Sequence, residues 1–111
     1  MSITAEPPPR TKRRTDTKTR TKQQPPYAVV IINDDVHTFE YVIICISKVF
    51  KYDLDKCKRL TMDVHTKGRA IVWVGSLELA ELKKEQIEGM GPDPFANKVC
   101  DFPLKVELEP Q

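Results

Sequence analysis

The spacing of apolar residues along positions 27–111 predicts three strands. Tyr27–Ile32 (YAVVII) is a short β-branched run, typical of a buried strand. Arg69–Gly75 (RAIVWVG) is a second such run, and it follows a predicted turn at Lys67-Gly68. Leu104–Leu108 (LKVEL) alternates apolar and polar residues, as a half-exposed third strand does.

Three amphipathic helices are predicted between these strands. Thr38 caps the first, Asp53 caps the second, which we expect to close at Val64-His65, and Ser76 caps the third, which Gly89 stops. The order βααβαβ predicts an α+β fold in which a three-stranded antiparallel sheet carries three helices on one face.

Polar residues directly follow the first predicted strand. Asn33, Asp34 and Asp35 place hydrogen-bond acceptors on a loop held by rigid structure, a common place for function, although turn formation and helix capping would also explain them. If the second helix packs beside the exit of this strand, His65 faces the Asn33-Asp34 loop. An amide oxygen, a carboxylate and an imidazole nitrogen then converge, a set that suits an ammonium group with three donors. Capture of an N-terminal amine is a known recognition mode.

Apolar residues surround this predicted site. They form either a cup for an apolar ligand group or ordinary core, and the pattern alone leaves both interpretations open. The residues are Phe39, Val42, Val64 and Leu104.

Composition divides the chain into two parts. Residues 1–26 contain five prolines, seven Lys or Arg and two acids, so they bury too little apolar surface to fold and are predicted to be a disordered extension. Residues 27–111 are predicted to form the single domain. The extension carries a charge of +5 and the domain, with eleven basic and fourteen acidic residues, −3. The domain therefore offers no basic surface for binding nucleic acid. An alternative interpretation of the function is that the basic extension, residues 1–26, contacts nucleic acid or a ribosome.

Several classes of protein are disfavoured. No stretch has the roughly twenty apolar residues of a membrane span, and the N-terminus lacks the apolar core of a signal peptide. The three cysteines are odd in number and lack CxxC spacing, as in reduced cytoplasmic proteins. A zinc site that combines them with His37 and His65 lacks ligand spacing. A hydrolase that uses His65 with Asp34 or Asp35 lacks a nucleophile placed by any motif. We expect no metal and no cofactor.

Three strings carry a resemblance to a known family. NDDVHTFEYVI (33–43), MDVHTKGRAIVWVGSLELAELK (62–83) and FPLKVELE (102–109) together resemble ClpS, the adaptor of the N-end rule pathway. The resemblance covers residues 27–109, nearly all of the predicted domain. It implies a monomeric adaptor without enzymatic activity. ClpS proteins bind substrates whose N-terminal residue is bulky and apolar (N-degrons) and pass them to a AAA+ unfoldase, ClpA or ClpC, which feeds the ClpP protease.

The resemblance also implies residue roles. Asn33, Asp34 and His65 would bind the free α-amino group. Glu78 and Lys83 would dock on the unfoldase, and the N-terminal extension would take part in substrate delivery. A larger set matches positions that line the side-chain pocket: Asp35, His37, Phe39, Val42, Thr61, Val64 and Leu104.

Three departures from the family pattern affect the expected pocket. Thr61 stands where a methionine is frequent, so we expect wider tolerance for N-terminal Ile or Val. Val36-His37-Thr38 stands where many relatives carry a proline, so the sequence does not fix the pocket depth on that side. The segment 89–101 is longer and richer in Gly and Pro than in relatives, and it can shorten the third helix or displace Leu104.

Overall fold

The computed structural model describes residues 24–97 and 99–111, and it confirms the six predicted elements in the predicted order. The predicted disorder of the N-terminal extension falls mostly on residues 1–23, which lie outside the described residues, so the domain boundary stays a prediction. The elements are β1 (Tyr27–Ile32), α1 (Phe39–Phe50), α2 (Leu54–Lys67), β2 (Arg69–Gly75), α3 (Leu77–Glu88) and β3 (Val106–Pro110).

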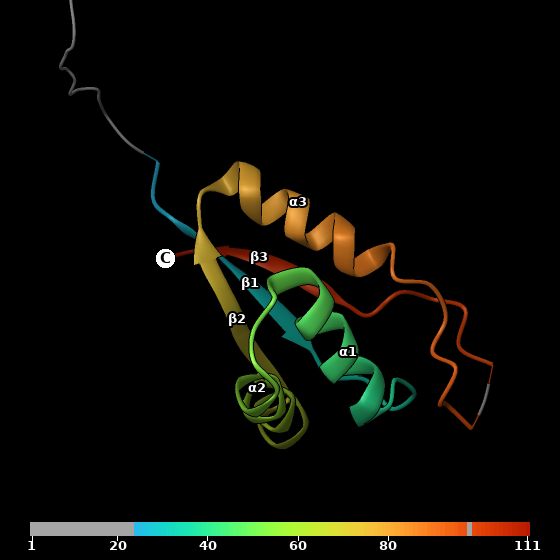
Figure 1. Ribbon diagram of the computed structural model, residues 1–111. Helices are drawn as coiled ribbons and strands as arrows, with labels where there is room; N and C mark the ends of the chain where they lie inside the picture. The colour runs from blue at the N-terminus through green and yellow to red at the C-terminus, as the bar shows by residue number, and fades with distance from the viewer. Residues whose placement is uncertain (1–23, 98) are drawn as a thin grey trace, which may run out of the picture.

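The sheet is antiparallel with β1 at its centre, in the order β2-β1-β3. The helices cover one face of it; in Figure 1, α1 lies in front of the end of β1, α3 runs above β3, and α2 lies beside the start of β2. Residues 28–31 are completely buried, as the β-branched run predicts. A bulge shifts the register between Val29, which faces Trp73, and Val30, which faces Ile71.

The helices begin at the three predicted caps. The side-chain oxygen of each cap accepts a backbone N–H three residues further on, at 2.8–3.3 Å. These caps are Thr38, Asp53 and Ser76. The second helix ends at Lys67, two residues later than expected. Gly68 causes this, because it adopts a left-handed conformation (φ 85°) and its N–H donates to the carbonyl of Val64 at 3.0 Å.

The third strand begins two residues later than predicted, at Val106 instead of Leu104. Register explains the difference. Ile31 faces Val106, and the N–H of Ile32 donates to the carbonyl of Lys105 at 3.0 Å, so residue 104 lies past the end of β1 and has no strand partner. Leu104 is nevertheless only 1% exposed and belongs to the core. The alternation of buried and exposed residues therefore extends beyond the strand to Leu104. For this reason the sequence pattern predicted a strand that starts two residues too early.

The core lies between the sheet and the helices. Val29 and Ile31 of β1 form one cluster with α1 residues such as Val42 and Ile46, and with Val64 of α2. Ala80 and Ile87, from α3, complete the cluster on the other side. No helix in the described parts of the chain is long and apolar enough to cross a bilayer.

Candidate functional site

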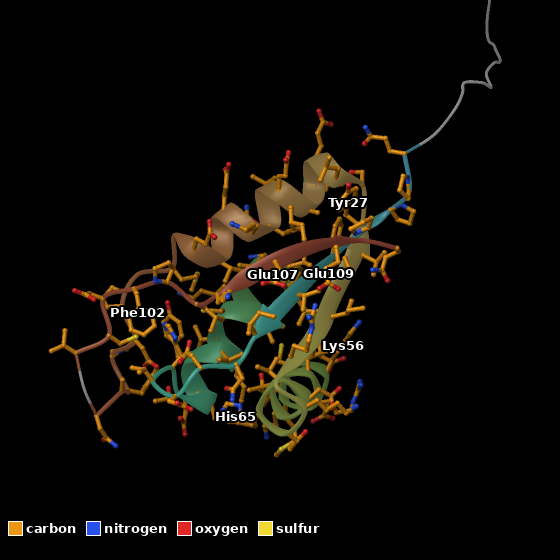
Figure 2. The ribbon with its side chains drawn as sticks, turned by 180° about the vertical axis from the view of Figure 1, so that it is seen from behind. Tyr27, Lys56, His65, Phe102, Glu107 and Glu109 are labelled. Carbon is orange, nitrogen blue, oxygen red and sulfur yellow. The ribbon has the colours of Figure 1, made fainter. Side chains whose placement is uncertain are left out.

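A backbone hydrogen bond joins the end of β1 to the end of α2. The N–H of Asn33 donates to the carbonyl of Gly68 at 2.9 Å, and Gly68 follows the last turn of α2, which carries His65. His65 is exposed, and its ring centroid lies 5.2 Å from that of Phe39 at the start of α1. Figure 2 shows His65 at the end of the sheet opposite Tyr27. The backbone thus brings the two predicted halves of the site to the same edge.

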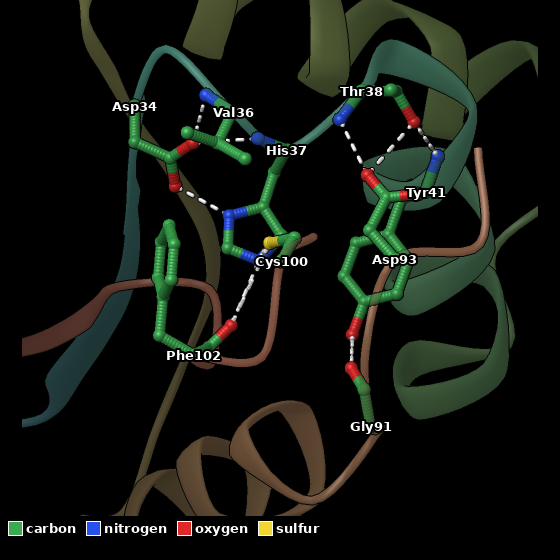
Figure 3. A network of polar contacts seen from close by, with 9 residues as sticks. All are labelled: Asp34, Val36, His37, Thr38, Tyr41, Gly91, Asp93, Cys100 and Phe102. Atoms are coloured by element: carbon green, nitrogen blue, oxygen red, sulfur yellow. Dashed lines mark hydrogen bonds and ion pairs between the residues drawn. The ribbon is translucent and has the colours of Figure 1, made fainter. Parts of the chain in front are cut away.

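The carboxylate of Asp34 is fixed by its own loop. Its Oδ1 accepts the N–H groups of Val36 and His37 at 2.8 and 2.7 Å, and its Oδ2 lies 2.5 Å from Nδ1 of His37 (Figure 3). Burial by itself would raise the pKa of this carboxyl, but the hydrogen bonds from His37 and Val36 outweigh burial and leave the pKa below its usual value. The side chain stays 23% exposed, so Asp34 presents an ionised, oriented carboxylate at the surface.

His37 is buried beside this carboxylate. Its other ring nitrogen faces the C-terminal loop, the long loop between α3 and β3 (residues 89–105). Its Nε2 lies 3.1 Å from the carbonyl oxygen of Phe102 and 3.2 Å from Sγ of Cys100. The ring stacks on Tyr41 and meets the ring of Phe102 edge-on, with centroids 5.3 and 5.0 Å apart. The contact with Asp34 is local in sequence, whereas the contacts with the C-terminal loop span more than sixty residues.

Asp93 fastens the long loop between α3 and β3 to the start of α1. Its Oδ2 accepts the N–H and the hydroxyl of Thr38 at 2.7 and 3.0 Å, and its Oδ1 accepts the N–H of Phe95 at 2.8 Å. The hydroxyl of Tyr41 donates to the carbonyl of Gly91 in the same loop. Sequence reasoning missed Asp93, and the only available signal was its place between two prolines, where an Asp side chain often closes a turn.

The residues predicted to line the side-chain pocket fall into two groups. Asp35 and His37 line a hollow of about 270 Å³ together with residues 36, 38 and 97, and Phe39 is half-buried. The other four are only 0–2% exposed: Val42, Thr61, Val64 and Leu104. The hydroxyl of Thr61 donates to the carbonyl of Cys57 at 2.7 Å, which leaves its methyl group to pack in the interior.

The two residues predicted to dock on an unfoldase lie on different sides of α3. Five positions separate Glu78 from Lys83, which places them about 140° apart around the helix axis. Glu78 is exposed in the first turn. Lys83 is half-buried, and its Nζ donates to the carbonyl of Val49 at 3.2 Å, close to the end of α1. Lys83 therefore also stabilises the contact between α1 and α3.

The contacts of Cys100, His37 and Asp34 have the connectivity of a nucleophile, base and orienting acid, but not the required reactivity. Cys100 is 2% exposed, and burial raises the pKa of its thiol, so it stays protonated and out of reach of a substrate. Burial also raises the pKa of the Cys45 thiol, to about 11. Within residues 24–97 and 99–111, no group of three or more His, Cys, Asp or Glu side chains is arranged to hold a metal ion.

Comparison with known proteins identifies the family. The sequence model of the ATP-dependent Clp protease adaptor protein ClpS matches residues 22–107. The chain belongs to the ClpS family. A ClpS of Thermosynechococcus vestitus is 45% identical over 67 residues, which are 60% of this chain and 71% of that protein. A ClpS of Campylobacter jejuni is 30% identical over 98 residues, 86% of this chain and 96% of that protein. ClpS proteins are adaptors of the Clp protease and not enzymes, and they interact with AAA+ unfoldases and with substrates.

A solved ClpS structure has the same fold. Agrobacterium tumefaciens ClpS2, bound to L-phenylalaninamide, superposes with a TM-score of 0.69, at 29% identity over 80% of this chain and the whole of the other. Its ligand is an amino acid amide with a free α-amino group and an aromatic side chain. The βααβαβ fold, with three helices on one face of a three-stranded antiparallel sheet, is thus a ClpS fold.

Proposed function

We propose that this ClpS protein binds proteins with bulky hydrophobic N-terminal residues through their free α-amino group and side chain, and delivers them to a AAA+ Clp unfoldase in the cytoplasm. The observation that carries the proposal is the junction of Asn33 with Gly68, which sets the Asn33-Asp34 loop beside the last turn of α2. A related fold that holds L-phenylalaninamide supports the same ligand chemistry.

The amine site would consist of Asn33, Asp34 and His65. An ammonium group offers three donors and a positive charge, and the ionised carboxylate of Asp34 is already oriented by its loop. An exposed, neutral imidazole at His65 accepts one further hydrogen bond, whereas the protonated ring would repel the ammonium. Pre-orientation matters here because it removes an entropy cost from binding.

The side-chain pocket would open from the closed state of the structure. Its proposed floor, Val42, Thr61, Val64 and Leu104, is sealed, and Phe39 contacts His65 at the rim. A bulky N-terminal side chain would displace Phe39 and bury itself on this floor, a gain of about 1.5–3 kcal/mol. Asp35 and His37 would border the same loop on its polar side.

Delivery to the unfoldase would use the other end of the molecule. The exposed Glu78 would make the contact directly, while Lys83 would contribute as it shapes the junction of α1 and α3. The unfoldase would be of the ClpA or ClpC type and would pass the substrate to ClpP. The adaptor would act as a monomer. The basic segment 1–26 would assist transfer as an extension distinct from the domain 27–111.

The direct test is fluorescence-anisotropy titration with peptides that differ only in residue one. We expect free Leu, Phe, Trp and Tyr termini to bind and Ala to bind poorly. Acetylation of the Leu peptide should weaken binding by tenfold or more, because each buried acceptor left unpaired costs about 1–3 kcal/mol. Acetylation is preferable to mutation of Asp34, since that carboxylate also holds its own loop.

A truncated protein separates this function from the basic-arm alternative. Removal of residues 1–23 should leave peptide affinity unchanged if the domain binds the peptide. Equal binding of free and acetylated peptides would refute the proposal. Salt-sensitive RNA binding that disappears with residues 1–23 would support the basic arm instead.

A further inference from the structure

His37 lies between the proposed amine acceptor and a loop more than sixty residues away. Its ring is almost fully enclosed, with a side-chain exposure of 1%, whereas the carboxylate of Asp34 beside it is 23% exposed. One ring nitrogen faces Oδ2 of Asp34 and the other faces residues 100–102. A buried ring with a partner at both nitrogens holds a single orientation.

The two oxygens of Asp34 are held by different groups. Backbone N–H groups of its own turn bind Oδ1, so the turn alone fixes that oxygen. Only the ring of His37 is within hydrogen-bond distance of Oδ2 among the described residues. Because an ionised carboxylate accepts and never donates, Nδ1 of His37 must carry the proton. Without this donor, the hydrogen bonds of the turn would hold Oδ1 alone, and Oδ2 would lose the contact that orients it.

We infer that His37 is the positioning residue of the amine site, which fixes the carboxylate of Asp34 through Nδ1 and fastens it to the Cys100–Phe102 segment through Nε2. The inference rests on the proposed function and gives His37 a task beyond bordering a pocket. It also makes the Cys100–Phe102 segment a part of the site, acting through the ring of His37.

The surroundings of Nε2 keep this arrangement in both protonation states of the ring. When the ring is neutral, Nε2 accepts from the thiol of Cys100, and when it is protonated, Nε2 donates to the carbonyl of Phe102. The titratable groups that face the ring are Asp34, Cys100 and Tyr41, with Asp93 bonded to the adjacent Thr38. Nδ1 remains a donor to Asp34 throughout.

A matched pair of variants tests the inference. Asparagine places its amide nitrogen near the position of Nδ1, so His37→Asn retains a donor to Asp34. Glutamine reaches the position of Nε2, so His37→Gln retains the contact with the C-terminal loop and loses the donor. Both remove the same buried ring, which makes each the control for the other. The readouts are affinity for a Leu peptide, the pKa of the Asp34 carboxyl by carbon-13 NMR, and the thermal midpoint.

We expect His37→Gln to bind the Leu peptide about tenfold more weakly than His37→Asn, with a higher pKa of the Asp34 carboxyl and a similar thermal midpoint. Equal affinities, or a loss that follows the thermal midpoint in both variants, would mean that His37 only fills the core. If neither variant folds, nitrogen-15 NMR of the unmodified protein decides. A ring that carries a proton on Nδ1, whether or not Nε2 is also protonated, supports the inference, and a neutral ring whose single proton lies on Nε2 overturns it. Failure of the unmodified protein to bind any peptide would instead overturn the proposed function, while the pKa of Asp34 still reports the His37 bond.

Discussion

The buried carboxylate of Asp93 joins its own loop to the start of α1, and Asp93→Asn should destabilise the protein strongly for such a small change. Asp93 is 6% exposed and accepts three hydrogen bonds, two from Thr38 and one from Phe95. An asparagine has one oxygen and one NH₂ group in place of the two carboxylate oxygens. In one orientation of the amide, the NH₂ group points at the N–H of Phe95, and in the other it points at the N–H of Thr38. Either orientation loses at least one charge-assisted bond and creates one contact between two donors.

The expected cost is about 2–4 kcal/mol, because a hydrogen bond to a charged group contributes about 1.5–3 kcal/mol and an unpaired buried donor adds to the loss. For a domain of this size, that corresponds to a decrease of roughly 10–25 °C in the thermal midpoint. Urea unfolding followed by the fluorescence of Trp73 measures the change. Asp101→Asn is the matched control, since Asp101 is exposed in the same loop. Equal urea midpoints for the two variants would show that Asp93 does not hold the loop.

Two further predictions concern specificity and pH. Thr61→Met should lower affinity for an Ile-starting peptide several-fold more than for a Leu-starting peptide, because Thr61 is completely buried in the proposed pocket floor and a longer side chain there leaves less room for β-branching. Equal losses in anisotropy titrations would contradict it. The lowered pKa of the Asp34 carboxyl means that its hydrogen bonds stabilise the fold fully above the usual Asp pKa of about 3.9 and are lost as the pH falls through the folded-state pKa. Urea midpoints between pH 6 and pH 3 should therefore decrease less in Asp34→Asn than in the unmodified protein, and parallel decreases would refute this.

The helices were predictable because their ends depend on local chemistry. Thr38, Asp53 and Ser76 each accept a hydrogen bond from within the following turn, so the capping signal needs no knowledge of the rest of the chain. The start of β3 was not predictable in this way. The alternation of Leu104 and Val106 with polar residues shows which face of the segment is buried. It does not show where strand pairing begins, because that depends on the register of β3 against Ile31 of β1.

The contacts of the candidate site also differ in how far they could be predicted, because some are local in sequence and others are not. The proximity of Asn33 to the end of α2 follows from where a strand and a helix stop, and the sequence predicted the end of the strand and placed the end of the helix two residues early. The contact of His37 with Asp34 is also local, three residues apart, yet the sequence pattern does not distinguish it from pocket lining. The partners Asp93, Cys100 and Phe102 lie 55–65 residues from the groups that they contact, and no spacing rule connects them.

The long loop between α3 and β3 supports the segment that precedes α1. The sequence left open whether this Gly- and Pro-rich segment shortens the third helix or displaces Leu104; in the structure α3 spans Leu77–Glu88 and Leu104 is buried. The loop binds Thr38 through Asp93 and His37 through residues 100–102, on consecutive positions of the segment that links the Asp34 turn to α1. This segment is attached through the chain to β1 on one side and to α1 on the other. The loop adds a third attachment, which helps to hold the carboxylate of Asp34 in place. The ring of His37 and this loop therefore support each other, because residues 100–102 contact the ring on one side and the ring contacts Asp34 on the other.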